Sequence, residues 1–289
     1  MSNSNLRQGV EVPPYISATG GAVSGLVTRM VIAPIDIIKI RLQLNGGQDR
    51  YRGIIQTVRT ILYNEGVRAF WKGNLPAEIM YLIYGATQFA TYSTLNQLVS
   101  ETEKKLELKV PGSIHAVTIG ALSGCISTVM SYPFDVLRTR LAAKENPYFT
   151  SILTEAGEMY AKDGLRAFFR GIQLSIGYVS ISMGVSFGVY SFYKDHMANT
   201  PLESAAGLVA GTISKTVVYP LDLVKRRRHM AYEGRFVATM RYFLATEGIR
   251  GAYHGLTPAL IKAAPTAAVS FWCYEWTVDW LMRANNKFS

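Results

Sequence analysis

The chain has 289 residues, of which 49% are apolar and 17% charged, and its formal net charge is +10. Soluble domains carry about 25% charged residues, so the composition favours membrane helices with one face on lipid and one on a polar cavity. The basic residues do not form one exposed tract, which argues against a nucleic-acid partner and for an anionic substrate and anionic lipid. Cys125 and Cys273 are far apart and form no CxxC pair, so we expect no metal site and no cofactor.

Residues 1–14 are polar, and we expect neither a secretory signal nor a cleaved transit peptide there. Six apolar segments follow, each long enough to cross a bilayer of about 30 Å as a helix. Four of them are predicted at 15–45, 74–99, 172–197 and 256–283. The other two begin near residues 111 and 203 and extend through 133–138 and 220–225. Short amphipathic helices are predicted at 53–63, 150–160 and 235–246.

This order occurs three times, which predicts an all-α membrane protein with six transmembrane helices in three pseudo-threefold repeats and short amphipathic helices on one side. The predicted repeats cover 1–104, 105–200 and 201–289 and together form one integrated domain.

The pattern Pro-x-Asp-x-x-(Lys/Arg) occurs once in each repeat, at 34–39, 133–138 and 220–225. A proline inside a helix removes one backbone hydrogen bond and kinks the helix. An acid and a base three residues apart share one helix face. Three kinks at equal depth would bring these charges together around an axis, as a ring that can act as a gate.

A second repeated pattern is Gly-x-x-x-Gly, at 21–25, 120–124 and 207–211. Small residues four positions apart let helices approach closely in lipid, so these glycines predict helix contacts.

Three cations lie in apolar helices at the depth of a central cavity: Arg29, Lys215 and Lys262. An isolated cation inside a membrane is costly and marks a functional site, although the side chain can instead extend to a lipid headgroup. Together these cations suit a di- or triphosphate. The tyrosines that could contact a ring of such a substrate are Tyr81, Tyr84 and Tyr178.

The repeated motifs are those of the mitochondrial carrier family, in which P-x-[DE]-x-x-[KR] precedes [DE]-G and then aromatic-[KR]-G. Here the two later elements occur at 65–66 and 71–73, at 163–164 and 169–171, and at 247–248 and 253–255, with His254 replacing the last base. The resemblance covers 15–283. It implies a six-helix barrel that transports a solute by alternating access, and not an enzyme. It also implies a monomer in the mitochondrial inner membrane with both termini toward the intermembrane space.

The resemblance assigns two gates. The matrix gate would pair Asp36 with Arg138, Asp135 with Lys225, and Asp222 with Lys39. A glutamine four residues after the base braces such a pair in the family, and only Gln43 fits, because Ala142 and His229 occupy the other two positions. The cytoplasmic gate motif is degraded, and only Lys194 with Glu275 can pair. Because the matrix gate has three ion pairs and the cytoplasmic gate has only one, we expect the empty carrier to favour the cytoplasm-open state.

The resemblance also assigns substrate and lipid contacts. The substrate positions are Met80, Tyr178, Val179 and Lys262, with Glu78 and Tyr84 nearby and Arg29 and Lys215 on the odd-numbered transmembrane helices. The turns at Gly73, Gly171 and Gly255 resemble the family's cardiolipin sites.

Within the family, the stretches 24–29, 38–44, 135–140 and 213–223 resemble carriers of thiamine pyrophosphate. This implies import of that compound in exchange for nucleotides or thiamine monophosphate. Its pyrophosphate suits the cations, and its cationic aromatic ring suits the tyrosines and Glu78. The alternative within the family is a nucleotide or coenzyme A carrier. An uncoupling proton leak or a membrane adaptor without transport would be functions of other classes, and the intact hexapeptides argue against the adaptor.

Overall fold

The structure is a computed structural model that describes residues 13–44, 51, 53–105, 112–197, 206–230, 241, 245, 248 and 251–288. The long helices are α1 (Pro14–Leu44), α3 (Asn74–Lys105), α4 (Gly112–Ala143), α6 (Ile172–Met197), α7 (Ala206–His229) and α10 (Ala263–Phe288). The short elements are α2 (Ile54–Glu65), η3 (Val67–Trp71), α5 (Ile152–Asp163), η4 (Gly164–Phe169) and α9 (Leu256–Ile261). The all-α fold class predicted from the sequence is confirmed.

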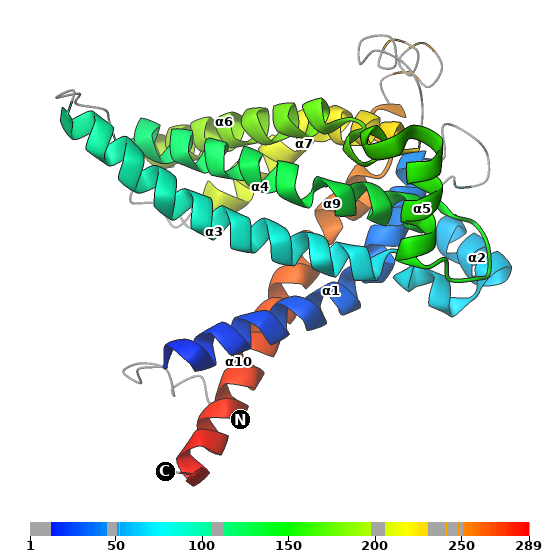
Figure 1. The fold of residues 1–289 in the computed structure, drawn as a ribbon, viewed down its shortest axis with the longest axis horizontal. Helices are drawn as coiled ribbons and strands as arrows, with labels where there is room; N and C mark the ends of the chain where they lie inside the picture. The colour runs from blue at the N-terminus through cyan, green and yellow to red at the C-terminus, as the bar shows by residue number, and fades with distance from the viewer. Residues whose placement is uncertain are drawn as a thin grey trace.

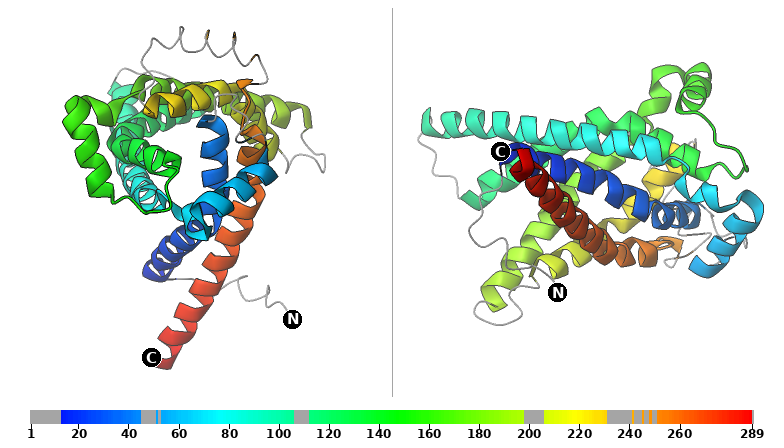
Figure 2. Two further views of the ribbon diagram at one scale, coloured as in Figure 1. Left: turned by 90° about the vertical axis from the view of Figure 1, so that its right-hand side faces the viewer. Right: turned by 90° about the horizontal axis from the view of Figure 1, so that it is seen from below.

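The long helices pack as three neighbouring pairs, α3 with α4, α6 with α7, and α1 with α10. They converge near α2 and α5, and α1 and α10 diverge from the others toward the chain termini (Figure 1). Seen from the end where α2 and α5 lie, the helices are arranged around a central axis (Figure 2). By length and composition, three of the described helical stretches can cross a membrane: Tyr15–Leu44, Ile114–Ala143 and Ile152–Tyr190.

The buried core lies at the convergent end, where the second halves of α1 and α4 pack on the short helices. Ile37, Ile40, Ile61 and Phe70 form one cluster there. A second cluster joins Val136 of α4 to Met159 of α5 and Ala167 of η4. The amphipathic pattern that predicted α2 and α5 therefore marks the faces that close this end of the bundle. The third predicted short helix, at 235–246, lies almost entirely outside the described residues.

The prediction of one unbroken helix over 256–283 is wrong, because the chain turns at Lys262 between α9 and α10. Pro265 explains the break. It has no N–H for the carbonyl of Ile261, and a proline ring clashes with the carbonyl four residues before it. The Lys262 N–H donates to the carbonyl of Pro258 at 3.2 Å, which completes the last turn of α9. The break places Lys262 at the junction of two helices.

The prediction that the repeated Gly-x-x-x-Gly pattern marks close helix contacts is wrong at five of its six glycines. Among the described residues, a Cβ on Gly21, Gly25, Gly120, Gly207 or Gly211 would meet nothing within 4 Å. Gly124 is the exception, because its Cβ would lie 3.2 Å from Val179 of α6. Close approach between α1 and α10 occurs instead at Gly20, where a Cβ would lie 2.7 Å from Val278. The neighbouring helices touch other faces of α1 and α7 than the one that this pattern marks.

A buried ionic cluster joins the first repeat to the second. Arg41 Nη2 lies 2.9 Å from Glu65 Oε2 and also donates to the carbonyl of Lys144 at 2.8 Å. Lys72 contacts Glu65 and the carbonyl of Asn146. Burial lowers the pKa of the Lys72 ammonium, and the hydrogen bond that Lys72 donates to Glu65 opposes this. These contacts hold α1, the turn after η3 and the segment after α4 together.

Candidate functional site

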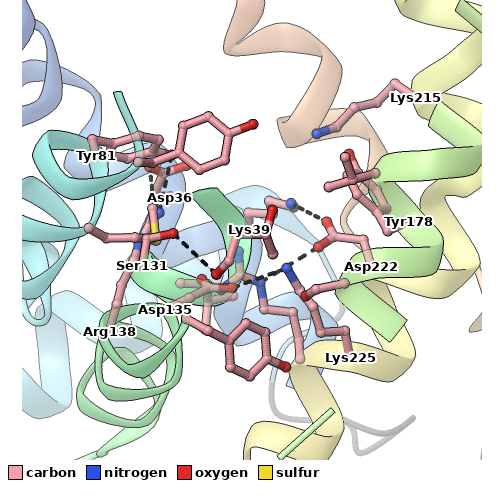
Figure 3. Close-up of a pocket in the computed structure, with 18 of the residues that line it drawn as sticks. Asp36, Lys39, Tyr81, Ser131, Asp135, Arg138, Tyr178, Lys215, Asp222 and Lys225 are labelled. Carbon is pink, nitrogen blue, oxygen red and sulfur yellow. Dashed lines mark hydrogen bonds and ion pairs between the residues drawn. The ribbon is translucent and has the colours of Figure 1, made fainter. Parts of the chain in front are cut away.

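Three buried interhelical ion pairs lie where α1, α4 and α7 converge. Lys39 Nζ is 2.6 Å from Asp222 Oδ2, Arg138 Nη2 is 2.5 Å from Asp36 Oδ2, and Lys225 Nζ is 3.1 Å from Asp135 Oδ2. The three carboxylates and their cations line one region of the molecule (Figure 3). Each pair joins two different repeats, so the predicted ring of alternating charge is present as a set of contacts. Its role as a gate stays a prediction.

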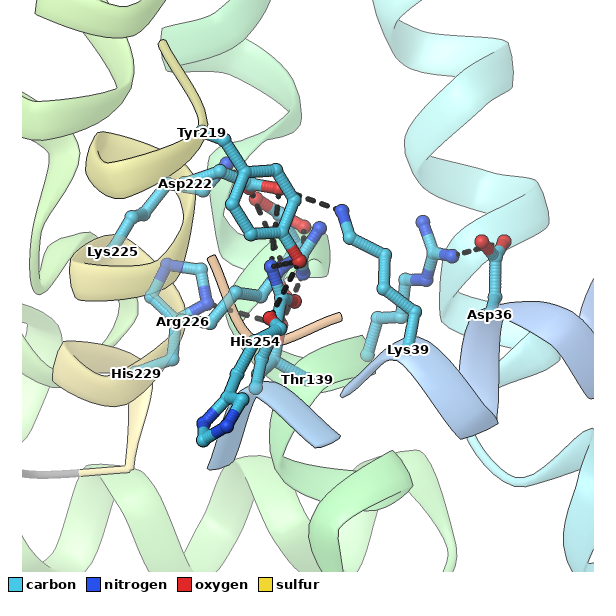
Figure 4. A network of polar contacts seen from close by, with 12 residues as sticks. Asp36, Lys39, Thr139, Tyr219, Asp222, Lys225, Arg226, His229 and His254 are labelled. Atoms are coloured by element: carbon cyan, nitrogen blue, oxygen red, sulfur yellow. Dashed lines mark hydrogen bonds and ion pairs between the residues drawn. The ribbon is translucent and has the colours of Figure 1, made fainter. Parts of the chain in front are cut away.

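Gln43 braces one of these pairs. Its amide nitrogen donates to the Tyr219 hydroxyl at 3.1 Å and to Asp222 Oδ2 at 3.4 Å. The Tyr219 hydroxyl in turn donates to the carbonyl of His254 at 2.8 Å (Figure 4). The Lys39–Asp222 pair is therefore tied to the turn that precedes α9.

The other two brace positions differ. Ala142 offers no polar side chain to the pair of Asp36 with Arg138. His229 is fully buried, and its two ring nitrogens lie 3.1 Å from Thr139 Oγ1 and 3.0 Å from the Tyr132 hydroxyl. Within the described part of the chain, His229 therefore supports residues beside the pair of Asp135 with Lys225 and makes no hydrogen bond to the pair itself.

Two of the carboxylates bind a second cation. Lys262 Nζ is 2.6 Å from Asp36 Oδ1, and Arg226 Nη1 is 2.9 Å from Asp135 Oδ1. Arg226 also donates to Thr139 Oγ1 at 2.5 Å, and its Nε lies 3.8 Å from Asp222 Oδ1. The sequence reasoning did not select Arg226. The signal was its place directly after the third hexapeptide, at the start of a run of three arginines.

A cavity of about 270 Å³ lies beside the ion pairs. Six of the eight predicted substrate residues line it: Met80, Tyr84, Tyr178, Val179, Lys215 and Lys262. Met80 and Tyr84 come from α3, Tyr178 and Val179 from α6, and Lys215 from α7. Lys215 and Tyr178 lie on the same side of the cavity (Figure 3).

Arg29 and Glu78 are not among the residues that line this cavity. The Arg29 guanidinium carbon lies 3.3 Å from the centre of the Tyr81 ring, and Tyr81 does line the cavity. The same tyrosine accepts a hydrogen bond from Arg138 Nη1 at 3.3 Å. Glu78 accepts from the Asn74 side-chain amide at 3.4 Å. Arg29 is thus separated from the cavity by one aromatic ring, which the spacing along the sequence did not indicate.

The cavity is strongly cationic. The charged residues that line it are Asp36, Asp135, Asp222, Lys39, Arg138, Lys215, Lys225, Arg226 and Lys262. Six of these are cations and three are carboxylates, so their formal net charge is +3. Because the cavity walls have a low dielectric constant, this positive charge attracts and orients a multivalent anion.

The predicted cytoplasmic gate lies at the divergent end. The side chain of Lys194 lies outside the described residues, so its predicted pair with Glu275 stays a prediction. Asn96, at the base position of the degraded motif in α3, lies 3.1 Å from His115 Nε2. His115 Nδ1 lies 2.7 Å from Glu103, so this histidine joins the end of α3 to the start of α4.

A comparison with known protein families gives the class of this chain. The family described as mitochondrial carrier protein matches residues 10–103, 110–201 and 197–285. The chain belongs to the mitochondrial carrier family. It is therefore a solute carrier and not an enzyme, and it is a multi-pass protein of a mitochondrial membrane.

Several relatives to which the chain is similar are named mitochondrial thiamine pyrophosphate carrier 1. The protein of that name from Kluyveromyces lactis is 38% identical over 95% of this chain and 94% of its own length. The one from Scheffersomyces stipitis is 37% identical over 98% of this chain and 96% of its own length. The one from Meyerozyma guilliermondii is 39% identical over 94% and 96%.

Proposed function

We propose that this protein imports thiamine pyrophosphate across the mitochondrial inner membrane by alternating-access exchange, against nucleotides or thiamine monophosphate. The observation that carries the proposal is the cavity with a formal net charge of +3. The names of relatives that are similar over nearly the whole chain support the choice of cargo. A pyrophosphate ester carries two to three negative charges near neutral pH, which the excess of cations can balance.

The proposed binding roles follow from the cavity. Lys215 and Lys262 bind the pyrophosphate as charged hydrogen-bond donors. Tyr84 and Tyr178 contact the aromatic part, and Met80 and Val179 form apolar walls. Arg29 acts through the Tyr81 ring on which it stacks, and Glu78 lies one turn of α3 away from that ring and favours the positively charged moiety.

The three ion pairs close the matrix side in this proposal, and both termini face the intermembrane space. Closure by three buried pairs is supported by their contacts between different repeats. Lys194 and Glu275 form the opposing cytoplasmic pair when the divergent helices approach each other.

Anionic lipid is the proposed membrane partner, with cardiolipin phosphates at the turns of Gly73, Gly171 and Gly255. An apolar groove of about 530 Å³ supports this at the first of them, between the N-termini of α3 and α5. Backbone N–H groups at helix N-termini favour phosphate, and the apolar lining suits acyl chains. The protein acts as a monomer and needs neither a cofactor nor nucleic acid.

Uptake into liposomes tests the cargo. Purified carrier in vesicles loaded with thiamine monophosphate or a nucleotide should take up labelled thiamine pyrophosphate with saturation. Lys215→Ala should reduce that uptake about tenfold or more, because a hydrogen bond from a charged group contributes about 1.5–3 kcal/mol. Lys162→Ala is the matched control, because Lys162 is exposed on α5, and this variant should transport normally.

A nucleotide or coenzyme A carrier, the alternative function, would give the opposite result. Saturable uptake of labelled ADP or coenzyme A, with none of thiamine pyrophosphate, would replace the proposed cargo by that of the alternative carrier. Full thiamine pyrophosphate uptake by Lys215→Ala would remove Lys215 from the binding site.

A further inference from the structure

Four tyrosines among the described residues line the cavity, and three of them already have another side chain over the ring. Two guanidinium carbons lie 3.3 and 5.8 Å from the centre of the Tyr81 ring. Lys225 Nζ lies 5.8 Å from the centre of the Tyr178 ring. The Tyr132 ring is stacked with Phe169, with 6.4 Å between the ring centres. The electron-rich faces of these three rings therefore have partners within the protein.

Tyr84 is the fourth of these tyrosines, and none of the described cations or aromatic rings lies over it. Its hydroxyl is directed toward α4, 3.7 Å from the position that a Cβ on Gly124 would take. Val179 of α6 lies 3.2 Å from the same position. With Met80, one turn earlier on α3, Tyr84 and Val179 form an uncharged wall of the cavity. The Tyr84 ring is thus available to a ligand.

This uncharged wall lies away from cations that line the cavity. On α4, Arg138 lies about 21 Å beyond Gly124, at about 1.5 Å per residue. Lys215 lies on the opposite side of the cavity from Tyr81, which is one turn before Tyr84 on α3 (Figure 3). Like charges repel strongly where the dielectric is low. A cationic ring is therefore more stable at the uncharged wall than beside these cations, which can then bind the negative end of the same ligand.

We propose that Tyr84 recognises the positive charge on the ring of the cargo and thereby sets the orientation of the bound molecule. The thiazolium ring of thiamine pyrophosphate lies over Tyr84 at the uncharged wall, and the pyrophosphate extends toward Lys215. Tyr178 packs against the cargo but does not select for its ring charge, because Lys225 already lies over that tyrosine. The inference rests on the proposed function, because it assumes a cargo that has both a pyrophosphate and a cationic ring.

The same contact makes Tyr84 a specificity-determining residue. A nucleotide also has a di- or triphosphate, but its base has no permanent positive charge. The cations of the cavity can therefore bind both classes of compound, whereas a cation–π contact at Tyr84 favours thiamine pyrophosphate.

Two ligands that differ only in the charge of the ring test this assignment. In 3-deazathiamine pyrophosphate a neutral thiophene replaces the thiazolium and keeps its shape. We would measure the concentration of each ligand that halves the uptake of labelled thiamine pyrophosphate into liposomes, and take the ratio of the two. Tyr84→Leu should reduce the preference for the charged ring by about three- to thirtyfold relative to the parent, which is the contribution of a cation over an aromatic ring. The ratio does not depend on how much of the protein is active.

Two further variants are matched controls. Tyr84→Phe keeps an aromatic face and should keep most of the preference. Tyr178→Leu removes a ring from the same cavity, and it should weaken the binding of both ligands without changing their ratio. A purely structural role of Tyr84 would likewise weaken both ligands equally, because packing does not depend on the ring charge.

The outcomes separate this inference from the proposed function. If the parent takes up thiamine pyrophosphate but Tyr84→Leu keeps the parent ratio, the role of Tyr84 is wrong and the proposed cargo stands. If Tyr178→Leu changes the ratio as much as Tyr84→Leu does, the orientation is wrong. If the parent takes up ADP or coenzyme A and no thiamine pyrophosphate, the cargo is wrong and the inference falls with it. Tyr84→Met, which also lacks a ring, gives the same test if Tyr84→Leu folds poorly.

Discussion

At the scale of single residues, three glycines decide how closely the repeats pack. Gly73, Gly171 and Gly255 have φ values of +73°, +84° and +84°. A Cβ on Gly73 would lie 2.6 Å from the carbonyl oxygen of Arg138, and one on Gly255 would lie 3.3 Å from that of Lys39 and 2.8 Å from the Tyr219 hydroxyl. Each of these glycines therefore packs against a helix of another repeat, at the residue that supplies the base of an ion pair.

Gly255→Ala tests this contact. We expect a loss of about 1–3 kcal/mol in stability, because alanine disfavours a positive φ and its Cβ displaces the Tyr219 hydroxyl from Gln43. Thermal unfolding in detergent measures the effect. Gly157→Ala on α5, where a Cβ meets nothing within 4 Å among the described residues, should be neutral or slightly stabilising. Equal melting temperatures for the two variants would contradict the packing role.

Single residues also decide which carboxylate or aromatic ring each buried cation contacts. The Pro-x-Asp-x-x-(Lys/Arg) spacing predicted three acids and three bases on facing helices, and the structure brings them into contact. The spacing did not predict that Lys262 would bind Asp36, since the two residues are 226 positions apart in the chain. Nor did it predict that Tyr81 would stand between Arg29 and the cavity.

At the scale of elements, the convergent end is held by the cluster of Arg41, Glu65 and Lys72. Glu65 accepts from two cations that are themselves bound to carbonyls of the segment after α4. It connects α1 and the turn before α3 with the neighbouring repeat. The element [DE]-G therefore does more than end α2, because its acid balances buried charge.

Glu65→Gln should destabilise the carrier by about 3–5 kcal/mol, because it removes the carboxylate that two buried cations share. Among the described carboxylates, Arg41 would keep only the exposed Glu145, whose Oε1 lies 3.2 Å from Arg41 Nη1. Glu158→Gln is a suitable comparison, since Glu158 is exposed and contacts Lys144 at 3.3 Å. An exposed pair contributes about 0–1 kcal/mol. Melting temperatures of both variants, measured side by side, decide the matter, and an equal shift would refute the role of Glu65.

At the scale of the whole molecule, the two ends are closed to different degrees. Three buried ion pairs, a glutamine brace and two additional cations join α1, α4 and α7 where they converge. Toward the termini, α1 and α10 diverge from α3, α4 and α6 (Figure 1). This asymmetry has the direction that the degraded cytoplasmic motif predicts.

The empty carrier should therefore favour the cytoplasm-open state. Ser131 lines the cavity, so it can be replaced by cysteine in a protein whose Cys125 and Cys273 are replaced by alanine. An impermeant thiol reagent added from the cytoplasmic side should label this variant faster than reagent added from the matrix side. Mitoplasts and inverted inner-membrane vesicles give the two sides. Predominant labelling from the matrix side would contradict both the orientation and the asymmetry of closure.

The sequence by itself determined the helical class, the threefold repetition and a ring of three acids and three bases around an axis. Each depends on periodicity and spacing, which are local properties of the chain. The division into repeats at 104/105 and 200/201 remains a prediction. The local pattern gave two wrong predictions. At the Gly-x-x-x-Gly faces the neighbouring helices pack elsewhere, and before Pro265 a single proline breaks the predicted helix.

Only the tertiary structure decided which cations share a carboxylate, which aromatic ring separates Arg29 from the cavity, and how Lys262 is oriented. The physical reason is that these contacts join side chains from different repeats, whose meeting depends on helix rotation and depth. Spacing along one helix specifies a face, but the neighbour of that face is specified by packing. The excess of positive charge in the cavity, on which the proposed cargo depends, is a property of that packing.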